Sequence, residues 1–185
     1  MRKLIYAINL TIDGCCDHTK MVPAEDDFEY HINLVKDADL FVYGRKTYQL
    51  MVPYWPDIAK NPAGETKTDI EFAQAFSANK IIVFSKTLDK AEGKNTEIVR
   101  TNLKDEILKL KQEQGKSILT GGADIPEQLI QLGLVDEYRI LVHPVIAGEG
   151  RRLFEGIDLQ EKLKLKLVES KVLKSGAVAL HYLKQ

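Results

Sequence analysis

The pattern that most constrains the fold is an alternation of short apolar runs with segments of helical periodicity. Runs of strand length, rich in β-branched and aromatic residues, occur at 3–10, 40–43, 80–85, 96–99, 117–120 and 138–142. Helical patterns lie between most of them, and this alternation is typical of a parallel sheet covered by helices. The sequence therefore predicts a three-layer α/β/α fold with a mixed, largely parallel central sheet.

The end of the chain follows a different pattern. Leucines alternate with lysines from Leu163 to Leu167, and Ser175 and Gly176 form a turn signal before a further apolar run at 177–183. Strict alternation indicates a strand with one solvated face, and two such strands joined by a tight turn form a hairpin. We therefore expect the sheet to end in an antiparallel hairpin, within a single domain over residues 1–185.

Local signals mark the helices and loops of the first half. Pro23 and the acidic residues 25–27 are typical of the first turn of a helix. The N–H that proline lacks would have no helical partner there, and the helix dipole favours negative charge. Prolines and a glycine predict a long surface loop at 53–66. Thr68 and Glu71 have the spacing of a capping box, which predicts a helix to about Phe76.

Charge and composition exclude several classes of partner. The chain has 26 basic and 27 acidic side chains and a formal net charge of −1, so nucleic acid is not an expected partner. No apolar stretch approaches the ~20 residues of a membrane span, so no membrane partner is expected. The adjacent Cys15 and Cys16 cannot form a disulfide framework, which favours the cytoplasm. Asp13, the two cysteines and His18 could be metal ligands, but no second cluster of ligands with zinc-like spacing exists in the sequence. No metal is therefore expected.

Three strand ends carry loops suited to phosphate groups. Ligands of open α/β sheets collect at the carboxyl ends of strands, and glycines there let the backbone approach a ligand. Each loop alone is also explained by an ordinary turn, and no Gly-x-Gly-x-x-Gly fingerprint is present. Together they favour a dinucleotide phosphate site. The candidate cofactor-binding residues are Gly44, Arg45, Lys46, Thr47, Ser85, Lys86, Gly121, Gly122 and Ala123.

Seven sequence blocks resemble, in order, the riboflavin-biosynthesis reductase domain of the dihydrofolate reductase-like family. The blocks are Asn9–Gly14, Tyr43–Tyr48, Pro53–Pro56, Ser85–Leu88, Gly121–Gly122, Gly133–Glu137 and His143–Phe154. The resemblance extends from about residue 3 to the end of the chain, and the last block is the most specific. The chain is thus similar to a stand-alone member of that family.

The resemblance implies a dihydrofolate reductase-like fold that binds NADPH. It assigns the loop Gly44–Thr47 to the phosphates, and Ser85 with Lys86 to the adenosine 2′-phosphate. The second loop of the family usually reads Ser-Arg, and Lys86 presents a point charge without the guanidinium fork. The pair Gly121–Gly122 resembles a cis peptide beside the pyrophosphate. The family also implies a homodimer joined through the C-terminal strands.

Two aspartates are candidates for the chemical step. Reduction of a C=N bond by hydride transfer usually needs a group that protonates the adjoining nitrogen. Pterin reductases carry a carboxylate in the first turn of the helix before the Gly-Arg loop, and Asp27 lies nearest to that position. Asp13 matches an aspartate that lies near the substrate ribose in riboflavin-type enzymes. Each aspartate also has a purely structural explanation. Asp27 would stabilise the helix dipole, and Asp13 would be a turn residue before Gly14.

The sequence therefore predicts an NADPH-dependent reductase of a pyrimidine- or pterin-like heterocycle. The leading interpretation is 5-amino-6-(5-phosphoribosylamino)uracil reductase of riboflavin biosynthesis. The chain lacks the His-x-Glu and Cys-x-x-Cys motif of the deaminase that often accompanies that reductase. A dihydrofolate reductase proper is a second interpretation, and a non-catalytic nucleotide-binding domain on the same fold is a third, from another class.

Overall fold

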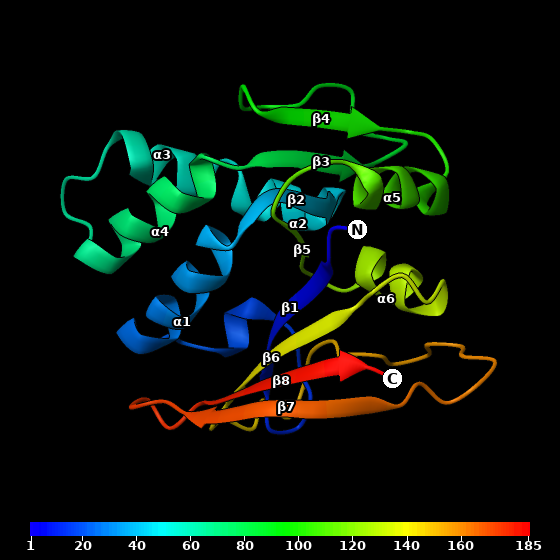
Figure 1. Cartoon of the computed structure of the whole chain (residues 1–185). Coiled ribbons are helices and arrows are strands. Elements are labelled where there is room, and N and C mark those ends of the chain that lie inside the picture. The colour runs from blue at the N-terminus through cyan, green and yellow to red at the C-terminus, as the bar shows by residue number, and fades with distance from the viewer.

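A computed structural model describes residues 1–185, which form an eight-stranded sheet in the order β4-β3-β2-β5-β1-β6-β8-β7 (Figure 1). From β4 to β6 every strand is parallel to its neighbours, whereas β8 is antiparallel to both β6 and β7. The strands are β1 (Leu4–Thr11), β2 (Ala38–Gly44), β3 (Lys80–Phe84), β4 (Thr96–Val99), β5 (Ser117–Thr120), β6 (Glu137–His143), β7 (Leu165–Val172) and β8 (Val178–Lys184). The predicted mixed sheet with a terminal hairpin is confirmed.

Six α-helices cover the two faces of the sheet. They are α1 (Glu25–Lys36), α2 (Arg45–Met51), α3 (Tyr54–Lys60), α4 (Lys67–Ser77), α5 (Leu103–Gln112) and α6 (Asp124–Gln131), with a 3₁₀ turn at His18–Lys20. Alternate residues of a strand point to opposite faces, so Phe41 and Tyr43 join one core with α1 to α4. Leu40 and Val42 join the other core with α5 and α6. These two cores confirm the three-layer α/β/α prediction.

The proline-rich segment 53–66 contains a helix, so the prediction of a continuous surface loop there was wrong. Helix α3 begins just after Pro53 and has Pro56 in its first turn, where a missing N–H breaks no helical bond. Trp55 is buried, and its ring centroid lies 4.5 Å from that of Phe72 in α4. Burial of this aromatic face stabilises a helix that the local composition does not favour.

Helix α4 starts two residues before the predicted capping box. Its N-cap is Thr66, whose side-chain oxygen accepts a hydrogen bond of 3.1 Å from the backbone N–H of Asp69. Thr68 instead donates to Glu25 at 3.0 Å, and Glu71 forms an ion pair with Lys36 at 2.6 Å. The side chains of Thr68 and Glu71, which the sequence pattern assigned to a capping box, therefore bind residues of α1 instead.

The parallel topology brings the carboxyl ends of β1, β2, β3, β5 and β6 to the same edge of the sheet. Helices α2 and α6 begin at this edge, directly after β2 and the loop that follows β5. At the far end of the strand order, β7 is an edge strand with exposed apolar side chains at Leu167, Val168 and Val172. No helix is long and apolar enough to span a bilayer.

Candidate functional site

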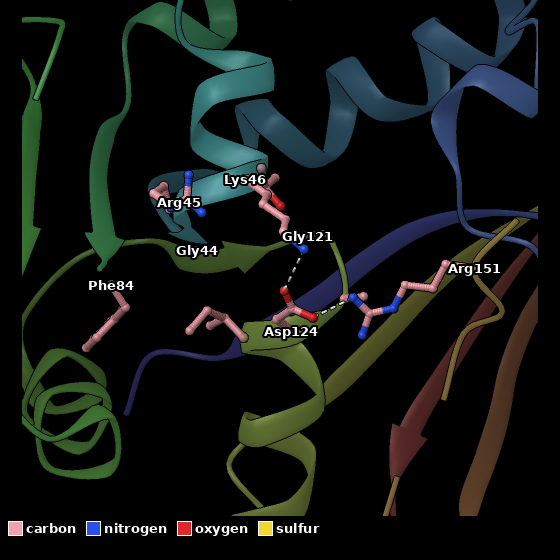
Figure 2. A pocket seen from close by; sticks show the side chains of 10 residues that line it. Gly44, Arg45, Lys46, Phe84, Gly121, Asp124 and Arg151 are labelled. Carbon is pink, nitrogen blue, oxygen red and sulfur yellow. Dashed lines mark hydrogen bonds and ion pairs between the residues drawn. The ribbon is translucent and has the colours of Figure 1, made fainter. Parts of the chain in front are cut away.

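A pocket of about 240 Å³ lies at the carboxyl edge of the sheet, between the end of β2, the loop after β5 and the first turn of α6 (Figure 2). Its lining comprises Gly44, Arg45, Lys46, Thr47, Phe84, Gly121, Ala123, Asp124, Ile125 and Arg151. Two of the three loops that the sequence nominated for phosphates therefore meet here, although their residues are separated by more than seventy positions in the chain. The pocket is the natural candidate for a ligand site.

Glycine is required where the two loops approach each other. Gly122 has φ of +81°, and a Cβ atom on it would overlap the hydroxyl of Thr47. A Cβ atom on Gly44 would lie 3.0 Å from Cγ1 of Ile125. A side chain on Gly122 would push the loop after β5 away from α2, and one on Gly44 would crowd Ile125 of α6, so the glycines keep the junction of β2 with α2 close to the loop after β5.

The Gly121–Gly122 peptide is trans, because the chain contains no cis peptide bond, and the expectation of a cis bond was wrong. The turn is made instead by the left-handed backbone of Gly122. Its carbonyl oxygen accepts a hydrogen bond of 2.8 Å from the hydroxyl of the buried Tyr6 in β1. The glycine pair is thereby fixed against the central strand.

Positive charge dominates the pocket lining. Arg45, Lys46 and Arg151 face a single lining carboxylate, that of Asp124. Arg151 pairs with Asp124, and its other terminal nitrogen lies 3.1 Å from a carboxylate oxygen of Glu127. The hydrogen bond from Arg151 to Asp124 is the main cause of the raised pKa of that guanidinium. An excess of cations in a concave site attracts anionic ligands.

The third predicted loop lies outside this lining. The hydroxyl of Ser85 accepts hydrogen bonds from the backbone N–H groups of Thr87 at 3.2 Å and Leu88 at 3.0 Å. Such a side-chain turn was the structural alternative for this loop. Lys86 is exposed, and Phe84, which ends β3 immediately before the loop, does line the pocket. The pair Ser85–Lys86 therefore stands beside the pocket.

Asp13 anchors the loop that carries Arg151. Its carboxylate accepts hydrogen bonds from the Thr11 hydroxyl at 2.6 Å and from the N–H groups of Ala147 and Gly148 at 3.0 Å. These bonds, the one from Thr11 first, hold the pKa of Asp13 far below its usual range. An ion pair of 3.2 Å to Arg152 adds to them. Asp13 does not line the pocket, and its catalytic role stays a prediction.

Asp27 is buried away from this pocket, with only 1% of its surface exposed. One carboxylate oxygen accepts a bond of 2.8 Å from the N–H of Ala24, the N-cap residue of α1, as the third residue of a capping box does. The other accepts one of 2.8 Å from the hydroxyl of Ser175. Nδ1 of His143, at the end of β6, lies 3.7 Å from the carboxylate. The structure thus places Asp27 at the carboxyl edge of the sheet, beside a second titratable group.

Two imidazoles accompany Asp27. Burial lowers the pKa of His143, and Nε2 of that ring is buried without a hydrogen-bond partner. Burial also lowers the pKa of His31 to about 4, and its Nε2 lies 2.8 Å from the side-chain oxygen of Asn9. Burial thus favours the neutral form of both imidazole rings.

Asp124 and Arg151 were not among the site residues predicted from the sequence. A signal existed for each, since Asp124 directly follows the loop Gly121–Ala123 and Arg151 lies in the block His143–Phe154. What the sequence lacked was their contact, which spans 27 positions and depends on the path of the loop after β6.

The sequence model of the family described as RibD C-terminal domain matches residues 2–179. A curated relative, Uncharacterized protein YyaP of Bacillus subtilis (strain 168), is 32% identical over 98% of this chain and 94% of its own length.

Solved structures resemble the whole chain. A candidate riboflavin biosynthesis protein of Shewanella sp. PV-4 has a TM-score of 0.74 at 18% identity, covering 100% of this chain and 99% of that one. The Thermotoga maritima diaminohydroxyphosphoribosylaminopyrimidine deaminase/5-amino-6-(5-phosphoribosylamino)uracil reductase gives 0.68 at 16%, covering 100% and 57%. Dihydrofolate reductase of Enterococcus faecalis, complexed with NADP(H), gives 0.64 at 15%, covering 99% and 96%. The predicted dihydrofolate reductase-like fold is confirmed.

Proposed function

The chain belongs to the RibD C-terminal domain family, the reductase type of riboflavin biosynthesis, and from this we propose that it is an NADPH-dependent reductase. The proposed reaction is reduction of a C=N-type bond in a pyrimidine- or pterin-like substrate. The most similar named reaction is the reduction of 5-amino-6-(5-phosphoribosylamino)uracil, from which the Thermotoga maritima reductase takes its name. The observation that carries the proposal is the pocket at the carboxyl edge, where glycine loops and three cations converge.

The pocket residues fit the phosphates of NADPH. A Cβ atom at Gly122 or Gly44 would fill the space where the two loops meet, so the glycines keep a close approach of the backbone possible. Arg45, Lys46 and Arg151 supply charge for phosphate oxygens, and charge-assisted hydrogen bonds are about twice as strong as neutral ones. The Enterococcus faecalis dihydrofolate reductase, which shares the fold, was solved with NADP(H).

Ser85 and Lys86 are the proposed contacts of the adenosine 2′-phosphate. They follow Phe84, which lines the pocket, and the exposed ammonium of Lys86 is free to meet an anion. Bound NADPH would supply the hydride to the electrophilic carbon of the substrate's C=N-type bond. The protein would then have to bind and orient the two reactants, exclude water, and deliver a proton to the adjoining nitrogen.

Asp27 is the proposed proton donor or orienter. Its carboxylate is shielded from water, and Nδ1 of His143 lies 3.7 Å from it. A carboxylate held in this way by the Ala24 N–H and the Ser175 hydroxyl keeps one orientation. Asp13 is the second candidate, and its hydrogen bonds to Ala147 and Gly148 also explain it as the anchor of the Arg151 loop.

The test is turnover with purified protein. NADPH oxidation would be followed by absorbance with 5-amino-6-(5-phosphoribosylamino)uracil, and separately with dihydrofolate. Oxidation with the uracil derivative alone is expected. Turnover of dihydrofolate would instead favour a dihydrofolate reductase proper. Tight NADPH binding without oxidation across a panel of heterocycles would favour the non-catalytic nucleotide-binding alternative.

A further inference from the structure

We propose that Asp124 is an internal counter-ion of the pocket, which holds Arg151 and Lys46 until a phosphate group of the ligand takes them over. The carboxylate then stays in the pocket, repels the bound anion and limits its affinity. The inference rests on the proposed function, because it concerns the anionic ligand of the same pocket.

Asp124 contacts cations on two separate segments. It is the first residue of α6, and one carboxylate oxygen pairs with Nη1 of Arg151 from the loop after β6. The other oxygen lies 3.9 Å from Nζ of Lys46 in α2. Figure 2 shows the side chains of Lys46 and Arg151 reaching toward Asp124 from different directions. A carboxylate so placed occupies the position that a phosphate group would have between the same cations.

The guanidinium of Arg151 can change partner without movement of its main chain. The main-chain carbonyl oxygen of Arg151 accepts a hydrogen bond of 2.9 Å from the N–H of Cys16. The N–H of Leu153 donates one of 2.9 Å to the carbonyl oxygen of Gly14. The Arg151 side chain is 42% exposed, so its reorientation disturbs little packing. Glu127 holds a second nitrogen at 3.1 Å. Because a guanidinium has five N–H donors, it can keep Glu127 while it binds a phosphate in place of Asp124.

The balance of charges decides the effect on affinity. The Asp124 side chain is 54% exposed, so its ion pairs are screened by solvent, and a phosphate can replace it at little loss. After the exchange, a carboxylate and a phosphate of like charge share one small pocket. Their repulsion opposes ligand binding and weakens as salt is added. Neutralising Asp124 should therefore tighten the binding of anions.

The experiment compares wild type with Asp124→Asn, using inorganic pyrophosphate and NADPH as probes in isothermal titration calorimetry. The variant is expected to bind both probes on the order of five- to tenfold more tightly. The gain should shrink as NaCl is raised, because screening weakens the repulsion. Asparagine keeps the shape and a polar side chain at the start of α6, and thermal melting checks that the fold is intact.

Asp105→Asn is the matched control. Asp105 also lies in the first turn of a helix, α5, is exposed and does not line the pocket. It reports the effect of losing one negative charge elsewhere on the protein. Pyrophosphate affinity in this variant should stay close to that of wild type.

The proposal is overturned if Asp124→Asn binds pyrophosphate no more tightly than Asp105→Asn, or if no form of the protein binds pyrophosphate. It is also overturned if the variant loses affinity for NADPH alone, since Asp124 would then accept a hydrogen bond from a ligand hydroxyl. Tighter pyrophosphate binding without any NADPH binding would support the counter-ion and reject the proposed function, so the two failures are distinguishable.

Discussion

The hydroxyl of Ser175, in the turn between β7 and β8, donates a hydrogen bond of 2.8 Å to the buried carboxylate of Asp27 in the first turn of α1. The two residues are 148 positions apart in the chain. The neighbouring backbone N–H of Ser175 also donates to Asp26 at 3.1 Å. The terminal hairpin is thus attached to the start of the first helix, and Ser175 completes the surroundings of the candidate proton donor.

Ser175→Ala should lower the free energy of unfolding by about 1–3 kcal/mol, because one oxygen of a buried carboxylate would lose its partner. Urea denaturation followed by circular dichroism measures this. Ser170→Ala, in β7, is the control for a serine on the same hairpin with an exposed side chain. Equal stabilities of the two variants would mean that the Ser175 hydrogen bond contributes nothing to the fold.

Asp27→Asn should lower turnover by about 100-fold if Asp27 acts in the chemical step, since positioned general acids contribute on this scale. Affinity for NADPH should change far less, because Asp27 does not line the cationic pocket. Asp26→Asn is the matched control, being the preceding residue in the same turn and bonded to the same serine. Equal turnover in the two variants would return Asp27 to a purely structural role in the capping box of α1.

NADPH should bind at least about tenfold more tightly than NADH, because charge-assisted contacts to the extra phosphate are worth ~1.5–3 kcal/mol each. Lys86→Ala should narrow the gap by weakening NADPH alone, as fluorescence titration of both cofactors would show. Lys90→Ala, which removes an exposed lysine further along the same segment, should leave the gap unchanged. Similar affinities for the two cofactors in wild type would contradict the assignment of Ser85 and Lys86.

Gly122→Ala should lose most NADPH affinity with a smaller loss of thermal stability. The new methyl group would overlap the Thr47 hydroxyl and push apart the two loops of the pocket, while both cores stay packed. The double variant with Thr47→Ala should recover part of the stability. Gly64→Ala is the control for the cost of placing an alanine at positive φ. Gly64 also has a positive φ, but no atom lies within 4 Å of its added Cβ. Normal NADPH binding by Gly122→Ala would place the phosphate site elsewhere.

The protein should be a homodimer joined through the β7–β8 hairpin. Strand β7 is at the edge of the sheet, and Val172 on it is 73% exposed. Val172→Lys should halve the mass found by light scattering at micromolar concentration. Val22→Lys, which adds the same charge at a residue outside the hairpin that is 92% exposed, should leave the mass unchanged. A monomer mass for wild type would refute the prediction.

Local patterns were sufficient for most of the fold. The β-rich runs and the turn at Ser175–Gly176 lie where the sequence predicts them, because each depends on residues a few positions apart. The loops Gly44–Thr47 and Gly121–Ala123 were recognisable for the same reason, and parallel strands bring them to one edge. Helix α3 was missed, because its stability comes from Trp55 packing on Phe72 rather than from its own composition.

Local periodicity and short motifs were thus enough to predict the strands, the glycine loops and the family, but not helix α3. Which polar groups meet was settled only by the folded arrangement of the chain. Three aspartates have partners that are 27 to 148 positions away from them in the chain. Asp13 bonds to Ala147 and Gly148, Asp27 to Ser175, and Asp124 to Arg151. Hydrogen bonds and ion pairs act over a few ångströms, so they follow the packing of segments rather than their spacing in sequence.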